Sequence, residues 1–227
     1  NLCSANSSFT VSQPALLTGT ILATDPSCGR QNGVLNAQVS GGTSPFTYQW
    51  SAGASNGPSV NGLGPGTYSL LVTDAQNCSA TLQATLTNIP GPTVSVTGTD
   101  HVTCFGLSNG GATISAAGVS APFTYQWLPV GGNAAVAQNL SAGIYTAGVT
   151  DSLGCNATVT LSVNEPAPLV IVIDSLKNVS CAGFSDGAIY VSAQGGTSPY
   201  SYNWSFGSSG PVADSLAAGS YTVNVSD

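Results

Sequence analysis

Three tryptophans mark equal intervals along this sequence: Trp50, Trp127 and Trp204 lie 77 residues apart. Each of them ends a similar phrase, which reads GGTSPFTYQW at residues 41–50, GVSAPFTYQW at 118–127 and GGTSPYSYNW at 195–204. Regular spacing of this kind is the signature of a chain built from structural repeats. A catalytic site is rarely needed in triplicate, so the phrase favours a structural interpretation.

The repetition extends beyond this phrase. A second segment reads NGLGPGTYSLLVTD, QNLSAGIYTAGVTD and DSLAAGSYTVNVSD, starting at Asn61, Gln138 and Asp214, and a third opens on Cys3, Cys78 and Cys155. Asn1 is not an initiator and no leader is visible, so we expect a piece of a longer protein. The predicted parts are the last strand of a preceding repeat at 1–13, β-sandwich repeats at 14–90 and 91–167, and a repeat lacking its last strand at 168–227.

Within each repeat, apolar and polar side chains alternate, as in a strand with one buried face. Leu35, Ala37 and Val39 share one parity, for example. Only 5% of the residues are charged, and the abundant Gly, Ser, Thr and Val are typical of strands and turns. About seven short strands in 77 residues, without a helical stretch, predict an all-β fold of tandem immunoglobulin-like β-sandwich repeats.

Two recurring aromatic positions support the sandwich. A tryptophan late in the third strand would fill the space between the sheets, and a tyrosine that opens the penultimate strand resembles a tyrosine corner. These predicted core aromatics are Trp50, Trp127, Trp204, Tyr68, Tyr145 and Tyr221. Because the repeated aromatics share the buried parity, a core role is favoured over sugar binding.

Charge excludes several classes of function. The formal charge of −7 leaves nothing to bind a phosphate backbone or an anionic membrane, and no apolar run is long enough for membrane insertion. His101 is the only imidazole, so no catalytic triad recurs with the repeats. Asp74, Asp151 and Asp227 recur at one position, but one carboxylate is too few for calcium and fits an Asx turn instead. We therefore expect no enzyme, no cofactor and no metal.

The six cysteines form two sets, one before the second strand of a repeat and one at the start of the last strand. The first set is Cys28, Cys104 and Cys181, and the second is Cys3, Cys78 and Cys155. In a secreted chain, such regularity predicts disulfides. Metal binding is a poor rival, because the sequence has no CxxC motif and no Cys-His cluster.

Three pairing schemes are open. Pairing within a repeat joins Cys28 to Cys78, although these positions lie at opposite ends of a sandwich, too far apart for the roughly 6 Å between Cα atoms that a bridge needs. Pairing between repeats strung end to end joins Cys28 to Cys155, and we favour it. Pairing of adjacent cysteines, such as Cys3 with Cys28, leaves no thiol unpaired but requires the linker to double back.

The order of the motifs resembles the SprB repeat: Cys-Phe-Gly or Cys-Gly near an Asn-Gly or Asp-Gly turn, then GGTSPFTYQW, GTYSLLVTD and NC. This repeat is found in large surface adhesins of gliding Bacteroidetes and in related long secreted proteins. The resemblance implies type IX secretion to the bacterial cell surface, and a filament or adhesin whose repeats form an extended stalk in gliding motility or attachment. The implied partners are other repeats of the same chain, surface polysaccharide or other filament subunits.

The resemblance also gives meaning to three Asp-Ser-Leu triplets, because Asp-Ser/Thr-aliphatic is an O-glycosylation signal in Bacteroidetes. It would place glycans on Ser152, Ser175 and Ser215, with a polar turn as the alternative interpretation of each. Three functions stay open: a structural stalk, repeats that themselves bind polysaccharide, and the accessory array of a secreted enzyme whose catalytic domain lies elsewhere.

Overall fold

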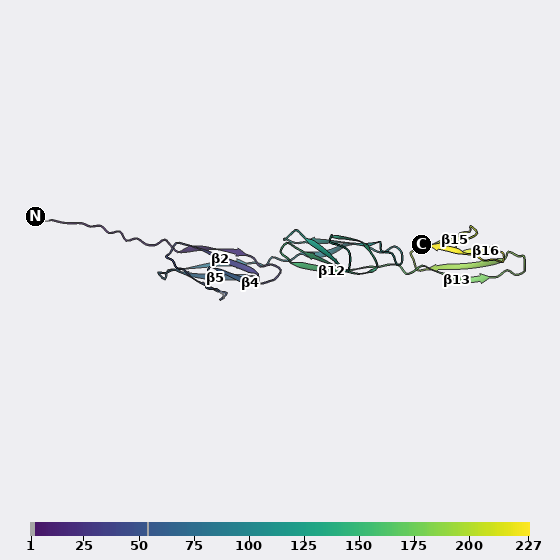
Figure 1. Ribbon diagram of the computed structural model, residues 1–227, viewed down its shortest axis with the longest axis horizontal. Coiled ribbons are helices and arrows are strands. Elements are labelled where there is room, and N and C mark those ends of the chain that lie inside the picture. The colour runs from purple at the N-terminus through teal and green to yellow at the C-terminus, as the bar shows by residue number, and fades with distance from the viewer. Residues whose placement is uncertain (1–2, 54) are drawn as a thin grey trace. The chain divides into compact units, whose positions relative to one another are not determined.

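The computed structural model describes residues 3–53 and 55–227, and every regular element in that part of the chain is a β-strand (Figure 1). The strands form three β-sandwiches, one per repeat, so the prediction of an all-β fold of immunoglobulin-like repeats is confirmed. None of the described residues belongs to a helix of the length and apolarity needed to cross a membrane.

The first sandwich consists of two three-stranded antiparallel sheets. Its strands are β1 (Thr18–Thr24), β2 (Gly33–Ser40), β3 (Thr47–Trp50), β4 (Ser59–Leu63), β5 (Gly66–Thr73) and β6 (Ser79–Leu86). One sheet has the order β1-β2-β4 and the other β3-β5-β6. The chain therefore changes sheet between β2 and β3, returns with β4 and changes again with β5, which is the crossing pattern of an immunoglobulin-like sandwich.

The second sandwich repeats this topology. Its strands are β7 (Thr93–Asp100), β8 (Gly110–Ala117), β9 (Thr124–Leu128), β10 (Val136–Leu140), β11 (Gly143–Thr150) and β12 (Asn156–Val163), and its sheets have the orders β7-β8-β10 and β9-β11-β12. One difference lies in the first strand, because a register shift between Val96 and Gly98 gives β7 one more residue than β1.

The third sandwich has five strands. They are β13 (Val170–Lys177), β14 (Gly187–Gln194), β15 (Ser201–Trp204), β16 (Val212–Leu216) and β17 (Val223–Ser226), in a sheet β13-β14-β16 and a two-stranded sheet β15-β17. Among the described residues it has no counterpart of β6 or β12. Its buried cluster is correspondingly small and holds four residues, Val191, Trp204, Ala213 and Leu216.

A complete repeat has six strands rather than the roughly seven expected. In the first repeat, the connection from β3 to β4 forms no strand at residues 51–53 and 55–58. This connection is rich in Gly and Ser, and the indole N–H of Trp50 donates to the carbonyl oxygen of Gly57 at 3.0 Å. The connection is therefore attached to the core tryptophan rather than added to a sheet edge.

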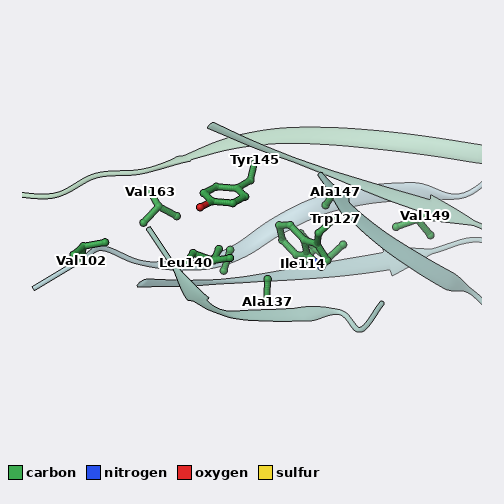
Figure 2. Packing of buried hydrophobic residues seen from close by; sticks show 10 residues of the cluster. Val102, Ile114, Trp127, Ala137, Leu140, Tyr145, Ala147, Val149 and Val163 are labelled. Atoms are coloured by element: carbon green, nitrogen blue, oxygen red, sulfur yellow. The ribbon is translucent and has the colours of Figure 1, made fainter. Parts of the chain in front are cut away.

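The core of each repeat lies between its two sheets. In the second repeat, the buried side chains are Val102, Ala112, Ile114, Trp127, Ala137, Leu140, Tyr145, Ala147, Val149 and Val163. Figure 2 shows these side chains pointing from both sheets into a common interior. Alternation along the strands places them there, because successive residues of a strand face opposite sides of the sheet.

The predicted parts compare with the observed strands as follows. The strands β1–β6 fall within 14–90, β7–β12 within 91–167 and β13–β17 within 168–227. Residues 3–13 are exposed and form no strand. The last strand of a sandwich pairs with the penultimate strand of the same sandwich. For residues 1–13 that partner strand would lie before Asn1. The assignment of residues 1–13 to a preceding repeat therefore stays a prediction.

Contacts along the chain define two compact units. The first unit contains 3–92 with two short segments, 118–121 and 151–155, and the second contains 93–117, 122–150 and 156–227. This division differs from the predicted repeat boundaries, which therefore stay predictions. It also shows that residues 151–155, the turn between β11 and β12, pack with the first unit rather than with the strands that flank them in sequence.

Candidate functional site: the cysteine loops and the aspartate turns

One disulfide is present among the described residues, between Cys28 and Cys155, whose Cα atoms lie 5.4 Å apart. Cys28 belongs to the loop between β1 and β2, and Cys155 ends the turn between β11 and β12. The bond thus joins cysteines of two successive repeats, as in the second of the three pairing schemes. Both cysteines lie within the first compact unit.

The loop that carries Cys28 has counterparts in the other two repeats. We call residues 25–32, 101–109 and 178–186 the cysteine loops. In the first, the backbone N–H of Ser27 donates to Oδ1 of Asn32 at 2.9 Å, and the Asn32 amide donates to the Ser27 hydroxyl. This side chain closes the loop just before the cysteine and fixes the backbone from which Cys28 projects.

The same closure recurs in the second and third cysteine loops. The N–H of Thr103 donates to Asn109 at 3.1 Å, and the N–H of Ser180 donates to Asp186 at 2.9 Å. The residue whose N–H the closing side chain accepts therefore stands directly before Cys104 and Cys181, as Ser27 stands before Cys28. All three loops hold their cysteine by the same contact.

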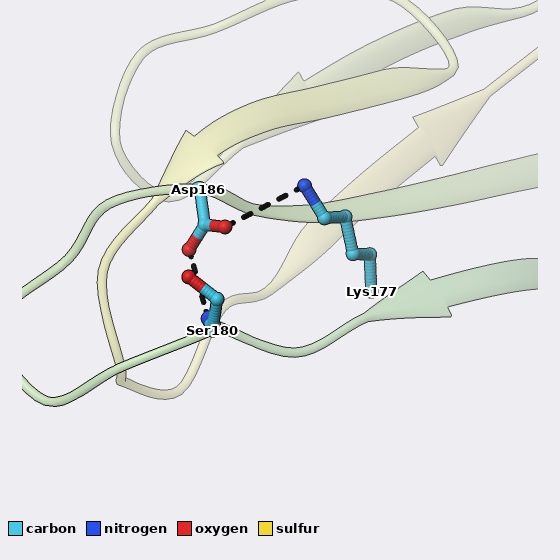
Figure 3. Close-up of polar contacts among 3 residues, drawn as sticks. All are labelled: Lys177, Ser180 and Asp186. Atoms are coloured by element: carbon cyan, nitrogen blue, oxygen red, sulfur yellow. Dashed lines mark hydrogen bonds and ion pairs between the residues drawn. The ribbon is translucent and has the colours of Figure 1, made fainter.

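In the third loop, the closing residue is a carboxylate (Figure 3). Figure 3 shows Asp186 between Ser180 and Lys177, whose Nζ lies 3.7 Å from Oδ2. The backbone N–H of Ser180, followed by its hydroxyl, lowers the pKa of Asp186 below its ordinary value; burial opposes this, and the Lys177 charge adds to it. Both side chains of this ion pair are partly solvated, so it contributes little beyond the loop closure.

The second half of the site is the turn that ends in a cysteine. We call residues 74–78 and 151–155 the aspartate turns. In the first, Oδ1 of Asp74 accepts the N–H groups of Gln76 and Cys78 at 2.9 Å, while Oδ2 accepts the N–H of Thr43. Burial raises the pKa of Asp74, but these three backbone donors outweigh it and hold the pKa below its ordinary value.

The second aspartate turn has the same construction. Oδ1 of Asp151 accepts the N–H groups of Leu153 and Cys155, each at 2.9 Å, and the N–H of Asp151 donates to the carbonyl of Cys155. The aspartates are therefore turn-forming residues, as their recurrence predicts. Asp227, at the corresponding third position, accepts the N–H of Thr197 at 2.6 Å, as Asp74 does from Thr43.

Contacts around the disulfide pack the second aspartate turn against the first unit. The Arg30 guanidinium donates to the carbonyl of Gly154 at 3.0 Å. Gly91 lies close to Cys155, because a Cβ atom at position 91 would be 3.0 Å from Cβ of Cys155. A larger residue at position 91 would therefore crowd the disulfide. As a result, only 1% of Cys155 is exposed, whereas Cys78 at the same turn position is exposed.

The first two cysteine loops are also tied to the segments that follow the last strand of their repeats. The N–H of Cys28 donates to the carbonyl of Ile89, and the N–H of Gly29 donates to the Asn88 side chain at 2.8 Å. In the second repeat, the N–H of Gly106 donates to a carboxylate oxygen of Glu165 at 2.7 Å. A glycine close after the loop cysteine is therefore held in both complete repeats.

The structure places the other predicted residues as follows. Cys3, Cys78, Cys104 and Cys181 are exposed thiols. The core aromatics Trp50, Trp127, Trp204 and Tyr145 are buried, while Tyr68 and Tyr221 are half-buried against their cores. All three tyrosines donate the hydroxyl hydrogen to the carbonyl oxygen four residues earlier, at 2.9–3.0 Å. The acceptors are Gly64 for Tyr68, Ser141 for Tyr145 and Ala217 for Tyr221.

The three O-glycosylation candidates are all exposed. Ser152 lies in the second aspartate turn, where its hydroxyl donates to the carbonyl of Ser120 at 2.9 Å. Ser175 lies on β13 and Ser215 on β16. A glycan on Ser152 would remove a hydrogen-bond donor that the turn uses, so Ser152 differs from the other two.

No cluster of three or more His, Cys, Asp or Glu side chains within residues 3–53 and 55–227 could hold a metal ion. His101 follows β7, and its Nδ1 accepts the N–H of Asn164 at 3.1 Å. It is thus a loop residue that holds the segment after β12.

Sequence reasoning missed the closing role of Asn32, Asn109 and Asp186. Its signal was present, because each stands directly before the glycine that starts the second strand of a repeat. It was interpreted as part of a turn motif alone. Sequence reasoning also missed Arg30 and Gly91, which occur at the joint only once and have no repeated signal.

The sequence pattern of a known family, described as the SprB repeat, matches residues 20–55, 95–132 and 173–209. No curated protein matches the sequence. Among solved structures, an I-band fragment of titin has 17% identity and a TM-score of 0.41 over 86% of this chain and 80% of its own. Immunoglobulin domains 1–5 of Sidekick-1 have 13% identity and a TM-score of 0.36 over 85% and 48%.

Proposed function

The SprB-repeat pattern matches this chain three times, and on that basis we propose that the chain is a structural stalk region of a secreted bacterial cell-surface filament or adhesin. The observation that carries the proposal is the disulfide between Cys28 and Cys155, which joins two successive repeats covalently. Tandem sandwiches connected in this way form a spacer whose length grows with the number of repeats.

The chemistry of the repeats supports a structural rather than a catalytic role. The residues that recur are core aromatics, turn aspartates and loop-closing Asn or Asp side chains, all of which serve to hold the backbone. A disulfide is typical of oxidising compartments and supports an extracellular location. A crosslink that constrains the unfolded chain also protects against shear and proteolysis outside the cell. Type IX secretion and a part in gliding motility are included in the proposal on the family likeness alone.

Glycosylation is part of the same proposal. Ser175 and Ser215 are exposed on strands, and among the described residues no hydrogen bond engages their hydroxyls. They are therefore better acceptors than Ser152, whose hydroxyl donates to Ser120. Mass spectrometry of the native protein tests the order: glycans on Ser152 but not on Ser175 or Ser215 would contradict it.

A second candidate function is binding of polysaccharide by the repeats themselves. It is favoured by a shallow hollow that recurs on the outer face of the same sheet in both complete repeats. In the second repeat it is lined by Gln126, Asn133 and Thr150, and in the first by the corresponding Gln49, Asn56 and Thr73. Neutral amides and hydroxyls are suited to hydrogen bonds with an uncharged sugar.

A glycan array with the purified chain separates the two candidates. A stalk gives no reproducible binding, and the variant Gln49→Ala with Gln126→Ala behaves like the parent chain. Reproducible binding that this double variant abolishes would overturn the pure stalk proposal in favour of the second candidate. Gln83→Ala is the matched control, because Gln83 lies on β6 and does not line the hollow.

A further inference from the structure

The free cysteine Cys104 stands in a loop built like the one that presents Cys28. In both loops a side-chain amide accepts the N–H of the residue before the cysteine, from Ser27 in one and from Thr103 in the other. In both loops a glycine close after the cysteine, Gly29 directly after Cys28 and Gly106 two residues after Cys104, donates to a side chain of the following segment. The loop of Cys104 thus shares two of its contacts with the loop of a cysteine that forms a disulfide, while the Cys28 N–H makes a further bond to Ile89.

The partner half of that disulfide also occurs more than once. Cys155 is delivered by an aspartate turn, and Cys78 ends a turn with the same pair of hydrogen bonds to its aspartate. Asp227 stands at the position of Asp74 and Asp151, and it makes the corresponding contact to Thr197. Both halves of the observed joint are therefore repeated features of this sequence.

Exposed apolar residues stand close in sequence to the free loop cysteines. Phe105 is 55% exposed and Leu107 47% exposed beside Cys104, and Phe184 is 55% exposed beside Cys181. In the first loop, which is one residue shorter, Arg30 stands at the position of Leu107, and its guanidinium contacts the bound turn. Exposed large apolar side chains of this kind are available to pack against another part of a protein.

We propose that Cys104 and Cys181 are receiving sites for the aspartate turn of the repeat that follows, each forming a disulfide with the turn cysteine. Phe105 and Leu107, and likewise Phe184, pack against the incoming turn in place of the arginine contact of the first joint. The inference rests on the proposed stalk and deepens it, because it makes one disulfide per pair of successive repeats the rule of the array.

Bond formation needs a disulfide oxidant of low molecular weight, such as oxidised glutathione. The Cys104 thiol loses its proton, and its thiolate displaces one glutathione thiolate to give a mixed disulfide. The thiolate of the turn cysteine then attacks the Cys104 sulfur and releases the second glutathione. Two protein thiols are oxidised to one disulfide, and one oxidised glutathione is reduced to two thiols.

The test lengthens the full chain by a copy of residues 152–164 after Asp227, which supplies an aspartate turn and a last strand to the third repeat. After oxidation with glutathione, mass spectrometry under non-reducing conditions maps the bridges. We expect the added cysteine to be joined to Cys104, and alkylation of Cys104 by iodoacetamide to fall about tenfold or more. An added cysteine that stays free, or that joins Cys3, Cys78 or Cys181, would overturn the inference. The matched control carries Ser at the added cysteine.

A second variant tests the same pairing without the added segment, so its result does not depend on that segment forming a strand. In it, residues 28–31 are replaced by a copy of residues 104–108, so that the loop of Cys104 faces the aspartate turn of Cys155. The inference expects the bridge to Cys155 to form as in the parent chain, and its absence in a folded chain would contradict it. Neither mapping depends on sugar binding, so failure of the stalk proposal on the glycan array is a separate result.

Discussion

At the scale of single residues, the polar contacts that recur fix the backbone where strands begin and end. The tyrosine hydroxyls of Tyr68, Tyr145 and Tyr221 each hold a carbonyl four residues earlier, just before the penultimate strand. The indole N–H groups of the tryptophans hold the connection to the fourth strand in the same manner. These aromatic side chains thus fill the core with their rings and fix the position of a loop with their one polar group.

Removal of one such hydroxyl tests its contribution. Tyr145→Phe deletes the donor to Ser141 without changing the ring, and we expect the free energy of unfolding to fall by about 1 kcal/mol. Urea denaturation measures the change as a lower midpoint. Tyr125→Phe is the control, because the structure shows no such bond for its hydroxyl. Equal effects of the two substitutions would show that the bond from the Tyr145 hydroxyl adds nothing to the free energy of unfolding.

The lowered pKa of Asp74 should make the stability of the folded chain depend on pH. Its pKa is below the ordinary value of 3.8 in the folded chain, so the folded state binds fewer protons than the unfolded state as the pH falls through this range. The stabilisation is complete above about pH 4 and is lost as the pH falls through the lowered pKa. Relative to Asp74→Asn, the parent chain should lose stability below about pH 4, measured by urea midpoints. A constant difference across that range would contradict the prediction.

At the scale of elements, the fourth strand of each repeat contains a bulge with a left-handed residue. Gly62, Asn139 and Ser215 occupy corresponding positions with φ of 71°, 56° and 56°. The register with the second strand shifts beside each of them. Glycine adopts this conformation without strain, asparagine tolerates it, and serine does so less readily.

The bulge predicts that substitutions at equivalent positions change the free energy of unfolding differently. Gly62→Ala should lower the free energy of unfolding by roughly 1–2 kcal/mol, because a Cβ is disfavoured in the left-handed region. Ser215→Gly should leave stability unchanged or raise it. Gly148→Ala is the control, since Gly148 lies in β11 without a positive φ and a Cβ there meets only ordinary contacts. Thermal unfolding of the three variants decides the matter.

Predictions from the sequence were right where they rested on a repeated pattern. They missed features that no repeated pattern marks. Alternation placed Leu35 and Ala37 in the core, where both are buried. The number of strands was overestimated, because the Gly- and Ser-rich segment after Trp50 is attached to the indole rather than to a sheet edge. The contacts of Arg30 and Gly91 with the second aspartate turn depend on how distant segments pack, which no local pattern records.

At the scale of the whole molecule, the disulfide closes a span of 127 residues. On the chain-entropy view, a crosslink over such a span stabilises by up to roughly 5 kcal/mol, and less where the enclosed repeats fold independently. Cys28→Ser with Cys155→Ser should therefore increase proteolytic cleavage near Ile89, whose backbone pairs with the cysteine loop. Cys104→Ser, which removes a thiol that is free in this chain, is the control. Equal cleavage of both variants would show that the bridge protects nothing.

The third sandwich should be the least stable of the three. Its buried cluster has four residues, and its first strand exposes Val170, Ile171 and Ile173. Hydrogen exchange should therefore be faster in β14 than in the equivalent strands β2 and β8, because the free energy of local opening follows the buried apolar contacts. Mass spectrometry of exchange measures all three strands in one sample. Slower exchange in β14 would contradict the prediction.

The observed disulfide joins two unlike positions, a loop before the second strand and a turn before the last strand. An array paired in this way has a direction, since a loop cysteine bonds forward along the sequence and a turn cysteine bonds backward. Recombination that adds or deletes one repeat in register therefore supplies or removes one cysteine of each kind. The number of repeats is then free to vary between generations without leaving mismatched thiols inside the array.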